Sequence, residues 1–261
     1  MPPRSHASLR EKRKTIKGIK MKIKAVLFDL DGTLLPLDQD EFSKTYLNAI
    51  ARSLAPHGYE PQSLVRSILH AIEKISKSDG TKTNEQTFWE DFCQELGERA
   101  ASSYPLFEEF YEKEFDNIKS VCSYSPKALE AVELVRKLGA VAVLATSPLF
   151  PSVATEKRMA WAGLSPSDFE FFTTYENSHY CKPSLDYYRE VCAKIGVTPE
   201  ECLMIGNDVS EDMVASRLGM RVFLHTDRLI NRKGEDVNAY PQGSFDDMIA
   251  FIRENTCKEF C

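Results

Sequence analysis

The chain has 261 residues, 43% of them apolar and 28% charged, which is enough to bury a sizeable core in one or two domains. This composition excludes collagen-like, intrinsically disordered and disulfide-scaffold proteins. The net charge of −6 conceals an asymmetry, because residues 1–24 carry nine Lys and Arg against one Glu, a net of +8, and the remainder carries −14. A body this acidic argues against a nucleic-acid-binding groove, which needs clustered basic residues to neutralise phosphates.

The basic run at the start of the chain is predicted to be disordered over residues 1–20, as blocks of like charge usually are. We interpret it as an upstream extension before Met21, with a transit peptide or a nucleic-acid-binding tail as alternatives. It lacks the apolar core of a secretory signal, and the longest apolar stretch, residues 138–145, is too short to span a bilayer. The seven cysteines are odd in number and lack metal-ligand spacing, which favours reduced thiols in the cytoplasm and argues against zinc.

The first predicted element is a short apolar strand over residues 22–28, which ends in Asp-Leu-Asp-Gly-Thr. About ninety residues with helical periodicity follow. Phe42, Tyr46, Ile50 and Leu54 recur every four residues, and a second apolar stripe is formed by Val65, Ile68, Leu69, Ile72 and Ile75. We therefore expect an all-helical domain over residues 37–120.

From residue 126 onward, helical and strand patterns alternate. The expected strands cover 141–145, 169–173, 202–205 and 221–224, and the expected helices cover 127–138, 152–161, 184–195, 210–218 and 244–252. Strands that alternate with helices indicate an α/β fold with a parallel sheet. We expect a three-layer Rossmann-like core built from residues 21–36 and 121–261, with the helical domain inserted after its first strand.

Polar residues directly follow several of these strands. Ligands of such sheets bind at the carboxyl ends of the strands, so these residues are expected to converge. They are Asp29 and Asp31 after the first strand, Thr146 and Ser147 after the second, Lys182 after the third, and Asn207, Asp208 and Asp212 after the fourth.

The chemistry of this set suggests phosphoryl transfer with a metal ion. Carboxylates from Asp29, Asp208 and Asp212 would repel one another unless a cation bound between them. Hard oxygen ligands suit Mg²⁺, which favours a few carboxylates together with substrate phosphate. Lys182 and a hydroxyl would neutralise phosphoryl charge, and a carboxylate can act as a nucleophile and form an aspartyl-phosphate.

These residues resemble the four motifs of the haloacid dehalogenase-like (HAD) superfamily, in its phosphatase branch. Residues 28–34, Phe-Asp-Leu-Asp-Gly-Thr-Leu, resemble the first motif. The strand that ends at Thr146 resembles the second, Lys182-Pro183 the third, and Gly206-Asn207-Asp208 with Asp212 the fourth. The motifs stand in family order, and the resemblance covers residues 22 to about 225.

The resemblance implies a role for each residue. Asp29 would be the nucleophile, and Asp31 the general acid that later activates water. Lys182 would neutralise the nucleophile and the phosphoryl group. Thr146 would bind a phosphate oxygen, as would Ser147, although the family usually has Asn at that position.

For the metal, the resemblance implies that Mg²⁺ is held by the carboxylates of Asp29 and Asp208 and by the backbone carbonyl of Asp31. Gly32, Asn207 and Asp212 would have supporting roles. An Asp two residues after the nucleophile favours a phosphatase or a phosphomutase over a dehalogenase.

The position of the helical insertion resembles that of a C1-type cap, which closes over the active site and usually implies a small phosphorylated metabolite as substrate. Residues 37–120 contain sixteen acidic and nine basic residues, which disfavours a very anionic leaving group. The function we predict is that of a Mg²⁺-dependent phosphatase, neither nucleic-acid-binding nor membrane-bound. The alternatives are a phosphomutase and a phosphometabolite-binding protein without turnover.

Overall fold

The computed structural model describes residues 22–256 except 98, 99 and 101. Its strands are β1 (Ala25–Phe28), β2 (Val141–Leu144), β3 (Phe171–Phe172), β4 (Cys202–Gly206), β5 (Arg221–His225) and β6 (Gln242–Gly243). Its α-helices are α1 (Gln39–Leu54), α2 (Pro61–Ser76), α3 (Asn84–Leu96), α5 (Tyr104–Lys113), α6 (Lys127–Lys137), α7 (Ser152–Trp161), α8 (Leu185–Ile195) and α9 (Phe245–Thr256). The 3₁₀ helices are η1 (Ala55–His57), η2 (Phe115–Val121), η3 (Pro166–Asp168), η4 (Pro199–Glu201), η5 (Met213–Leu218) and η6 (Val237–Ala239).

The six strands form one sheet in the order β3-β2-β1-β4-β5-β6, and every pair is parallel. Strand β1 is central, and its last residue, Phe28, pairs with Leu144 of β2 on one side and Ile205 of β4 on the other. The carboxyl ends of these three strands are therefore level with one another. The predicted α/β fold with a parallel sheet and a helical insertion is confirmed.

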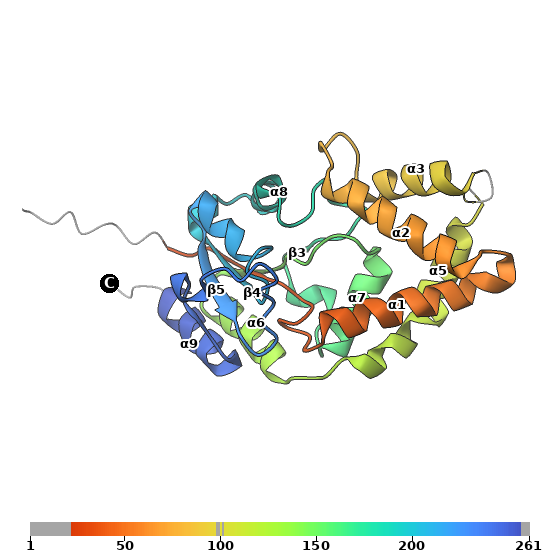
Figure 1. Cartoon of the computed structure of the whole chain (residues 1–261). Helices are drawn as coiled ribbons and strands as arrows, with labels where there is room; N and C mark the ends of the chain where they lie inside the picture. Colours follow the sequence, from red (N-terminus) through yellow and green to blue (C-terminus); the bar gives the residue numbers. More distant parts are fainter. Residues whose placement is uncertain (1–21, 98–99, 101, 257–261) are drawn as a thin grey trace, which may run out of the picture.

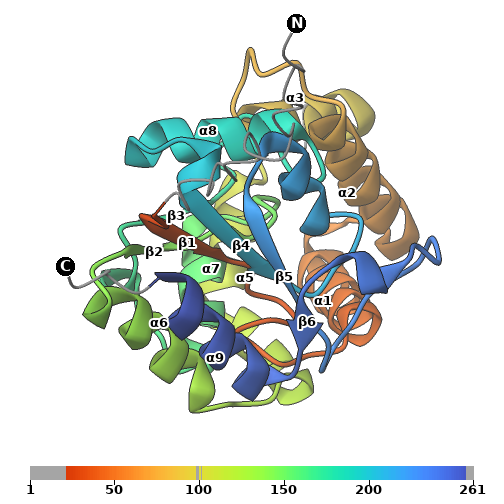
Figure 2. The ribbon, with the colours of Figure 1, turned by 90° about the vertical axis from the view of Figure 1, so that its left-hand side faces the viewer.

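Helices cover both faces of the sheet (Figure 2), because alternate strand residues point to opposite faces. Val26 and Phe28 belong to a core shared with Met248 of α9 and with the apolar side of α6. Ala25 and Leu27 face the other way, into a core shared with α8 and η5. The central strands are thus buried on both sides, as expected for a three-layer arrangement.

Helices α1, α2, α3 and α5, which lie between β1 and α6 in the chain, extend to one side of the sheet (Figure 1). The fourfold spacing of Phe42, Tyr46, Ile50 and Leu54 on α1 is confirmed, since all four are buried. The stripe on α2 differs from the expectation: Leu64, Ile68, Ala71 and Ile75 are buried, whereas Leu69 is 49% exposed. We refer to residues 37–120 as the cap and keep these limits as a proposal.

Two elements differ from the expected pattern. Residues 210–218 are not an α-helix; only Met213–Leu218 is helical, in the tighter 3₁₀ form. The Asp208 side chain accepts hydrogen bonds from the amides of Ser210 and Glu211, which form a turn ahead of this 3₁₀ helix. Strand β6 was not predicted, since a two-residue strand has no detectable periodicity.

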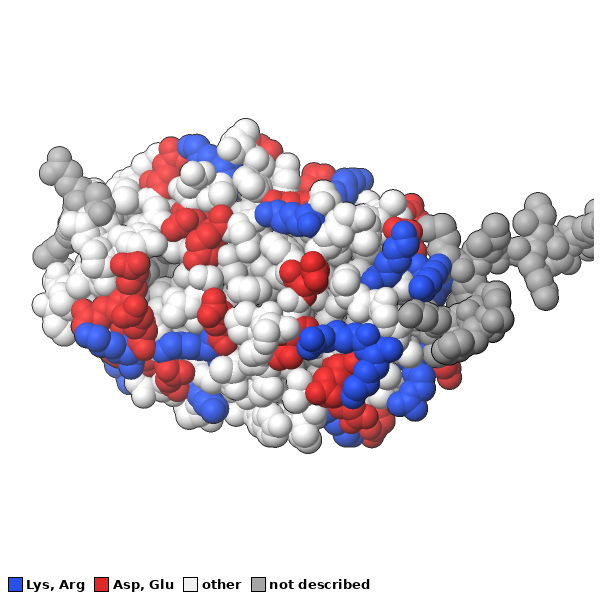
Figure 3. Space-filling model, turned by 180° about the vertical axis from the view of Figure 1, so that it is seen from behind, with Lys and Arg blue, Asp and Glu red and all other residues white. Residues whose placement is uncertain are grey.

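The surface shows acidic and basic side chains interspersed, and no continuous basic area is seen on the face in Figure 3. Among the described residues, no helix has the length and apolarity that a membrane span requires. The five described cysteines are free thiols. The predicted basic extension, residues 1–20, lies outside the described residues.

Candidate active site

Asp29 stands directly after β1 and is 8% exposed. Its amide donates to the carbonyl of Ile205 at 2.9 Å, which continues the β1–β4 pairing and sets Asp29 beside the segment that follows β4. Gly32 has a φ of +81°, and a Cβ there would lie 2.3 Å from Nδ2 of Asn207. Glycine is therefore required at position 32 by both conformation and space.

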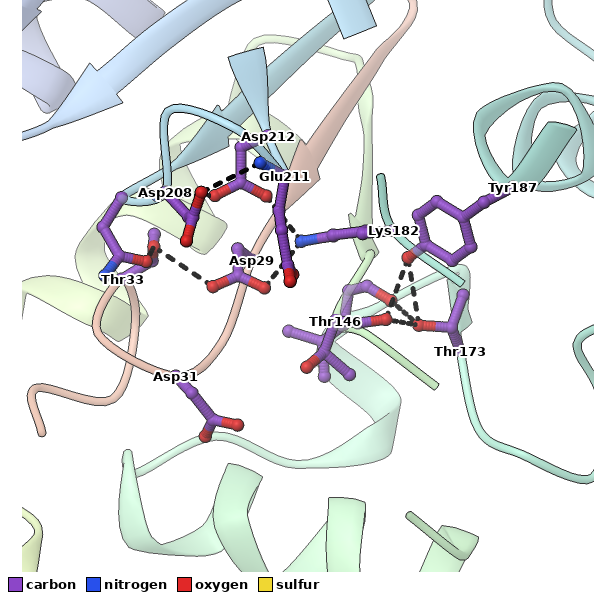
Figure 4. A network of polar contacts seen from close by, with 12 residues as sticks. Asp29, Asp31, Thr33, Thr146, Thr173, Lys182, Tyr187, Asp208, Glu211 and Asp212 are labelled. Carbon is purple, nitrogen blue, oxygen red and sulfur yellow. Dashed lines mark hydrogen bonds and ion pairs between the residues drawn. The ribbon is translucent and has the colours of Figure 1, made fainter. Parts of the chain in front are cut away.

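Lys182 is buried between two carboxylates (Figure 4), with its Nζ 2.7 Å from Oδ1 of Asp29 and 2.6 Å from Oδ1 of Asp212. Burial alone would lower the pKa of Lys182, but Asp212 and Asp29 outweigh it and raise that pKa well above its ordinary value. The lysine is therefore a permanent cation. Burial raises the pKa of Asp29 to about 7 despite the opposing effect of Lys182.

The segment after β4 adds further carboxylates. Asp208 accepts the amides of Ser210 and Glu211 through Oδ1, and Asp212 accepts the amide of Asp208 through Oδ2 at 3.0 Å. Burial raises the pKa of Asp208. Asn207 is buried, accepts a hydrogen bond from Thr33 at 3.0 Å and donates to the carbonyl of Arg228. The predicted supporting residue Asn207 thus joins two loops at the edge of the site.

Thr146 follows β2 and is 2% exposed. Its carbonyl accepts hydrogen bonds from the hydroxyls of Thr173 at 2.6 Å and Tyr187 at 2.9 Å (Figure 4). These two contacts fix the backbone on which Thr146 and Ser147 stand. Sequence reasoning missed Thr173 and Tyr187, because both residues otherwise read as ordinary core.

Asp31 is paired with a buried arginine that sequence reasoning also missed. Arg158 of α7, 1% exposed, donates to Oδ2 of Asp31, while its Nη2 donates to the hydroxyl of Thr155 at 3.2 Å. Its guanidinium lies 4.4 Å from the ring centre of Phe150. Oδ1 of Asp31 is buried and has no hydrogen-bond partner among the described residues. In the sequence, Arg158 could have been noticed only as a basic residue on the apolar side of a predicted helix.

A cavity of about 140 Å³ lies at the carboxyl edge of the sheet. Of the predicted residues, those that line it are Asp29, Asp31, Thr146, Ser147, Asn207, Asp208 and Asp212. Gln39, Glu211, Ile230 and Arg232 also line it and were not predicted. Arg232 pairs at 2.6 Å with Asp40 at the start of α1, so this ion pair joins the core to the cap beside the cavity.

Glu211 is the fifth carboxyl group in this cavity (Figure 4). Its side chain approaches the Lys182 and Asp29 pair from the turn that follows β4. Burial raises its pKa to about 8, with Lys182 acting in the opposite direction and Asp212 adding to the rise. The cavity thus contains more carboxyl groups than Lys182 alone could balance if all of them were ionised.

The donor set suits Mg²⁺. No group of three or more His, Cys, Asp and Glu side chains within the described residues is arranged to hold a metal ion. Mg²⁺, however, commonly takes only one or two protein carboxylates and completes its shell with water and substrate phosphate. Oδ2 of Asp208 has no hydrogen bond within the described part of the chain, and Oδ2 of Asp29 has only a 3.4 Å contact from Thr33. These two oxygens are therefore available to a hard cation.

Comparison with solved structures identifies similar folds. A protein described as a predicted phosphoglycolate phosphatase from Haemophilus somnus 129PT is 16% identical, with a TM-score of 0.55 over 88% of this chain and 97% of that one. A HAD phosphatase from Thermococcus onnurineus is 19% identical, with a TM-score of 0.52 over 89% and 97%. The HAD-hydrolase YfnB from Bacillus subtilis, described as bound to magnesium, is 16% identical, with a TM-score of 0.52 over 88% and 99%.

These identities are low enough that the three likenesses establish the fold alone. No curated protein matches the sequence. The family of haloacid dehalogenase-like hydrolases matches residues 23–218, a span that covers three quarters of the chain and includes the positions of all four motifs. The chain therefore belongs to the haloacid dehalogenase-like hydrolases.

Proposed function

We propose that the protein is a phosphatase that hydrolyses a small phosphate monoester through an aspartyl-phosphate on Asp29. One observation carries this proposal: the Asp29 carboxylate lies 2.7 Å from a fully buried lysine and opens, with Asp31 and Asp208, on the same cavity. A carboxylate oriented by a permanent cation can attack phosphorus, since the lysine also neutralises the incoming phosphoryl group.

In the first half-reaction, Asp29 forms a bond to phosphorus while the bond to the leaving oxygen breaks. Asp31 donates a proton to that oxygen, and the backbone held by Thr173 and Tyr187 presents Thr146 and Ser147 to the phosphate oxygens. In the second half-reaction, Asp31 removes a proton from water, which attacks the aspartyl-phosphate and releases inorganic phosphate and Asp29.

Mg²⁺ would be held by Asp29, Asp208 and the Asp31 carbonyl, and would supply charge neutralisation for the transferring phosphoryl group. Asp212 positions Lys182, because its carboxylate forms the second ion pair with the Lys182 ammonium group. Arg158 holds the Asp31 carboxylate under the cap, so Asp31 must exchange this contact for the leaving group during the reaction. The cap would exclude water while that exchange takes place.

The test is release of phosphate from p-nitrophenyl phosphate with and without Mg²⁺. Asp29→Asn is expected to abolish release, since the amide is not a nucleophile, whereas the exposed Asp246→Asn on α9 serves as the matched control and keeps full activity. Activity that survives Asp29→Asn would overturn the mechanism. A phosphoenzyme that forms but resists water would favour the phosphomutase alternative, and binding without any phosphoenzyme would favour the non-catalytic one.

A further inference from the structure

The start of helix α3, in the cap, is joined to the core by hydrogen bonds that the catalytic proposal does not use. The amides of Asn84 and Glu85 are the first two of this helix, and such amides have no partner within their own helix. They donate to the carbonyls of Ser178 at 2.8 Å and Tyr175 at 2.9 Å, which belong to the core segment between β3 and α8 (Figure 1). The core thus supplies acceptors for this end of the helix.

The side chain of Asn84 reaches further, to two loops that carry site residues. It is fully buried, and its Nδ2 donates to the carbonyl of Pro148 at 3.1 Å and to that of Tyr180 at 3.1 Å. Pro148 directly follows Ser147, which lines the active-site cavity, and Tyr180 stands two residues before Lys182. One side-chain amide from the cap therefore ties these two core loops together.

The orientation of the Asn84 amide follows from its surroundings. Its Nδ2 carries two hydrogen atoms and faces two carbonyl oxygens, whereas its Oδ1 is buried and has no hydrogen-bond partner among the described residues. A flipped amide would place Oδ1 against both carbonyls and leave the two N–H donors unpaired. Neither carbonyl accepts a hydrogen bond from any other described residue. The hydrogen bonds of this side chain thus all join the cap to the core.

A separate contact holds the loop between α2 and α3 against the same part of the core. The hydroxyl of Tyr180 donates to the carbonyl of Asp79 at 3.3 Å. Gly80 has a φ of +80°, and a Cβ there would collide with the Tyr180 hydroxyl. This close fit means that Tyr180 contacts the cap through its side chain as well as through its carbonyl.

We propose that Asn84 is a positioning residue for residues 146–148, the phosphate-binding segment, an inference that rests on the proposed phosphatase function. The core holds the carbonyl of Thr146 at one end of this segment, and Asn84 holds the carbonyl of Pro148 at the other. The bond from Asn84 to Tyr180 fixes the segment relative to the loop that leads to the catalytic lysine. The segment therefore presents its donors to phosphate at a fixed distance from the lysine ammonium.

The test compares Asn84→Asp with the wild type in hydrolysis of p-nitrophenyl phosphate and in calorimetric titration with inorganic phosphate, both with Mg²⁺. Aspartate has the shape of asparagine, but its carboxylate cannot donate, so both side-chain hydrogen bonds are lost. We expect kcat/KM to fall by at least about tenfold, with KM and the Kd of phosphate both raised several-fold. A residue that only stabilised the fold would lower the melting temperature and leave KM and this Kd at their wild-type values.

Two further variants accompany this measurement. Asn48→Asp is the matched control, because Asn48 is exposed on α1 and the same charge enters the cap there, and it should leave KM and the phosphate Kd unchanged. Asn84→Ser keeps one donor and adds no charge, so its effect should lie between those of the wild type and Asn84→Asp. Circular dichroism checks folding, and Asn84→Ser decides the question if Asn84→Asp does not fold.

Amide hydrogen exchange of Glu85, followed by NMR, reports the contact with the core independently of catalysis, because the partner of this amide is the carbonyl of Tyr175. We expect exchange at least about tenfold faster in the Asn84 variant than in the wild type. Wild-type KM and phosphate Kd in the folded variant would overturn the proposal, as would unchanged exchange at Glu85. Absence of turnover in the wild type would instead refute the phosphatase function, and the phosphate titration and the exchange rate would still decide the role of Asn84.

Discussion

Replacing Lys182 with Met should destabilise the protein strongly and in a pH-dependent manner. The change leaves the carboxylates of Asp29 and Asp212, at 12% and 1% side-chain exposure, without their shared cation. Removing one partner of a buried ion pair costs about 3–5 kcal/mol. At about 2–4 °C per kcal/mol for a chain of this size, the melting temperature should fall by about 6–20 °C in EDTA.

The pH dependence has a definite sign. Burial raises the pKa of Asp29 and Lys182 lowers it, so removal of Lys182 raises that pKa above its wild-type value of about 7. A carboxyl group whose pKa is higher in the folded than in the unfolded state contributes stability below the unfolded value and loses it as pH rises. The deficit of the Lys182→Met protein should therefore be larger at pH 8 than at pH 5.

Thermal unfolding followed by circular dichroism measures this deficit. The control is Lys113→Met, an exposed lysine paired with Glu109 on α5, whose loss should cost less than about 1 kcal/mol. Adding Asp212→Asn to Lys182→Met should restore part of the stability, because it removes one of the two unpaired carboxylates. A Lys182→Met protein as stable as the wild type at pH 8 would refute the buried charge balance described for this site.

Three further predictions concern residues that the structure adds to the site. In EDTA, the Glu211→Gln protein should become more stable relative to the wild type, by about 1–4 kcal/mol, as the pH rises from 5 to 8. The reason is that burial raises the pKa of Glu211 to about 8, whereas Gln does not titrate. A difference in the free energy of urea unfolding that does not change with pH would contradict this. Arg158→Met should lower kcat/KM by about 10–100-fold through loss of its bond to Asp31, with the exposed Arg217→Met as control; unchanged kinetics would exclude a positioning role. Arg232→Met should raise KM several-fold yet change stability by less than about 1 kcal/mol, since its pair with Asp40 is exposed; an unchanged KM would remove Arg232 from substrate binding.

The parts of the fold that were predictable are those with a strong local signal. Helix α7 begins and ends at the predicted residues because apolar periodicity runs between Pro151 and Gly163. The convergence of Asp29, Thr146 and Asp208 was predictable because parallel strands place their carboxyl ends at one edge. The strand β6 was not predictable, since two residues have no periodic pattern. The 3₁₀ form of η5 was not predictable either, since the pattern over residues 210–218 predicts a helix but does not distinguish a 3₁₀ helix from an α-helix.

The unpredicted site residues depend on tertiary structure. Arg158 and Asp31 are 127 residues apart, and their pairing exists only because α7 packs beside the loop after β1. The sequence predicts Glu211 to be an exposed helix residue. In the structure it lies in the tight turn after β4, and its carboxyl group points into the cavity. On α2, Leu69 would read as core, yet it is exposed because Leu64 and Ala71 complete the buried stripe instead.

The most direct test of the account is chemical identification of the phosphorylated residue. The protein is mixed with radiolabelled substrate and Mg²⁺, quenched in acid within the first turnover, and mapped by peptide mass spectrometry. We expect a hydroxylamine-sensitive acyl phosphate on Asp29, absent from Asp29→Asn and present in Asp246→Asn. Turnover with no label on Asp29, or with label on a Ser, Thr or His, would contradict the nucleophile assigned here.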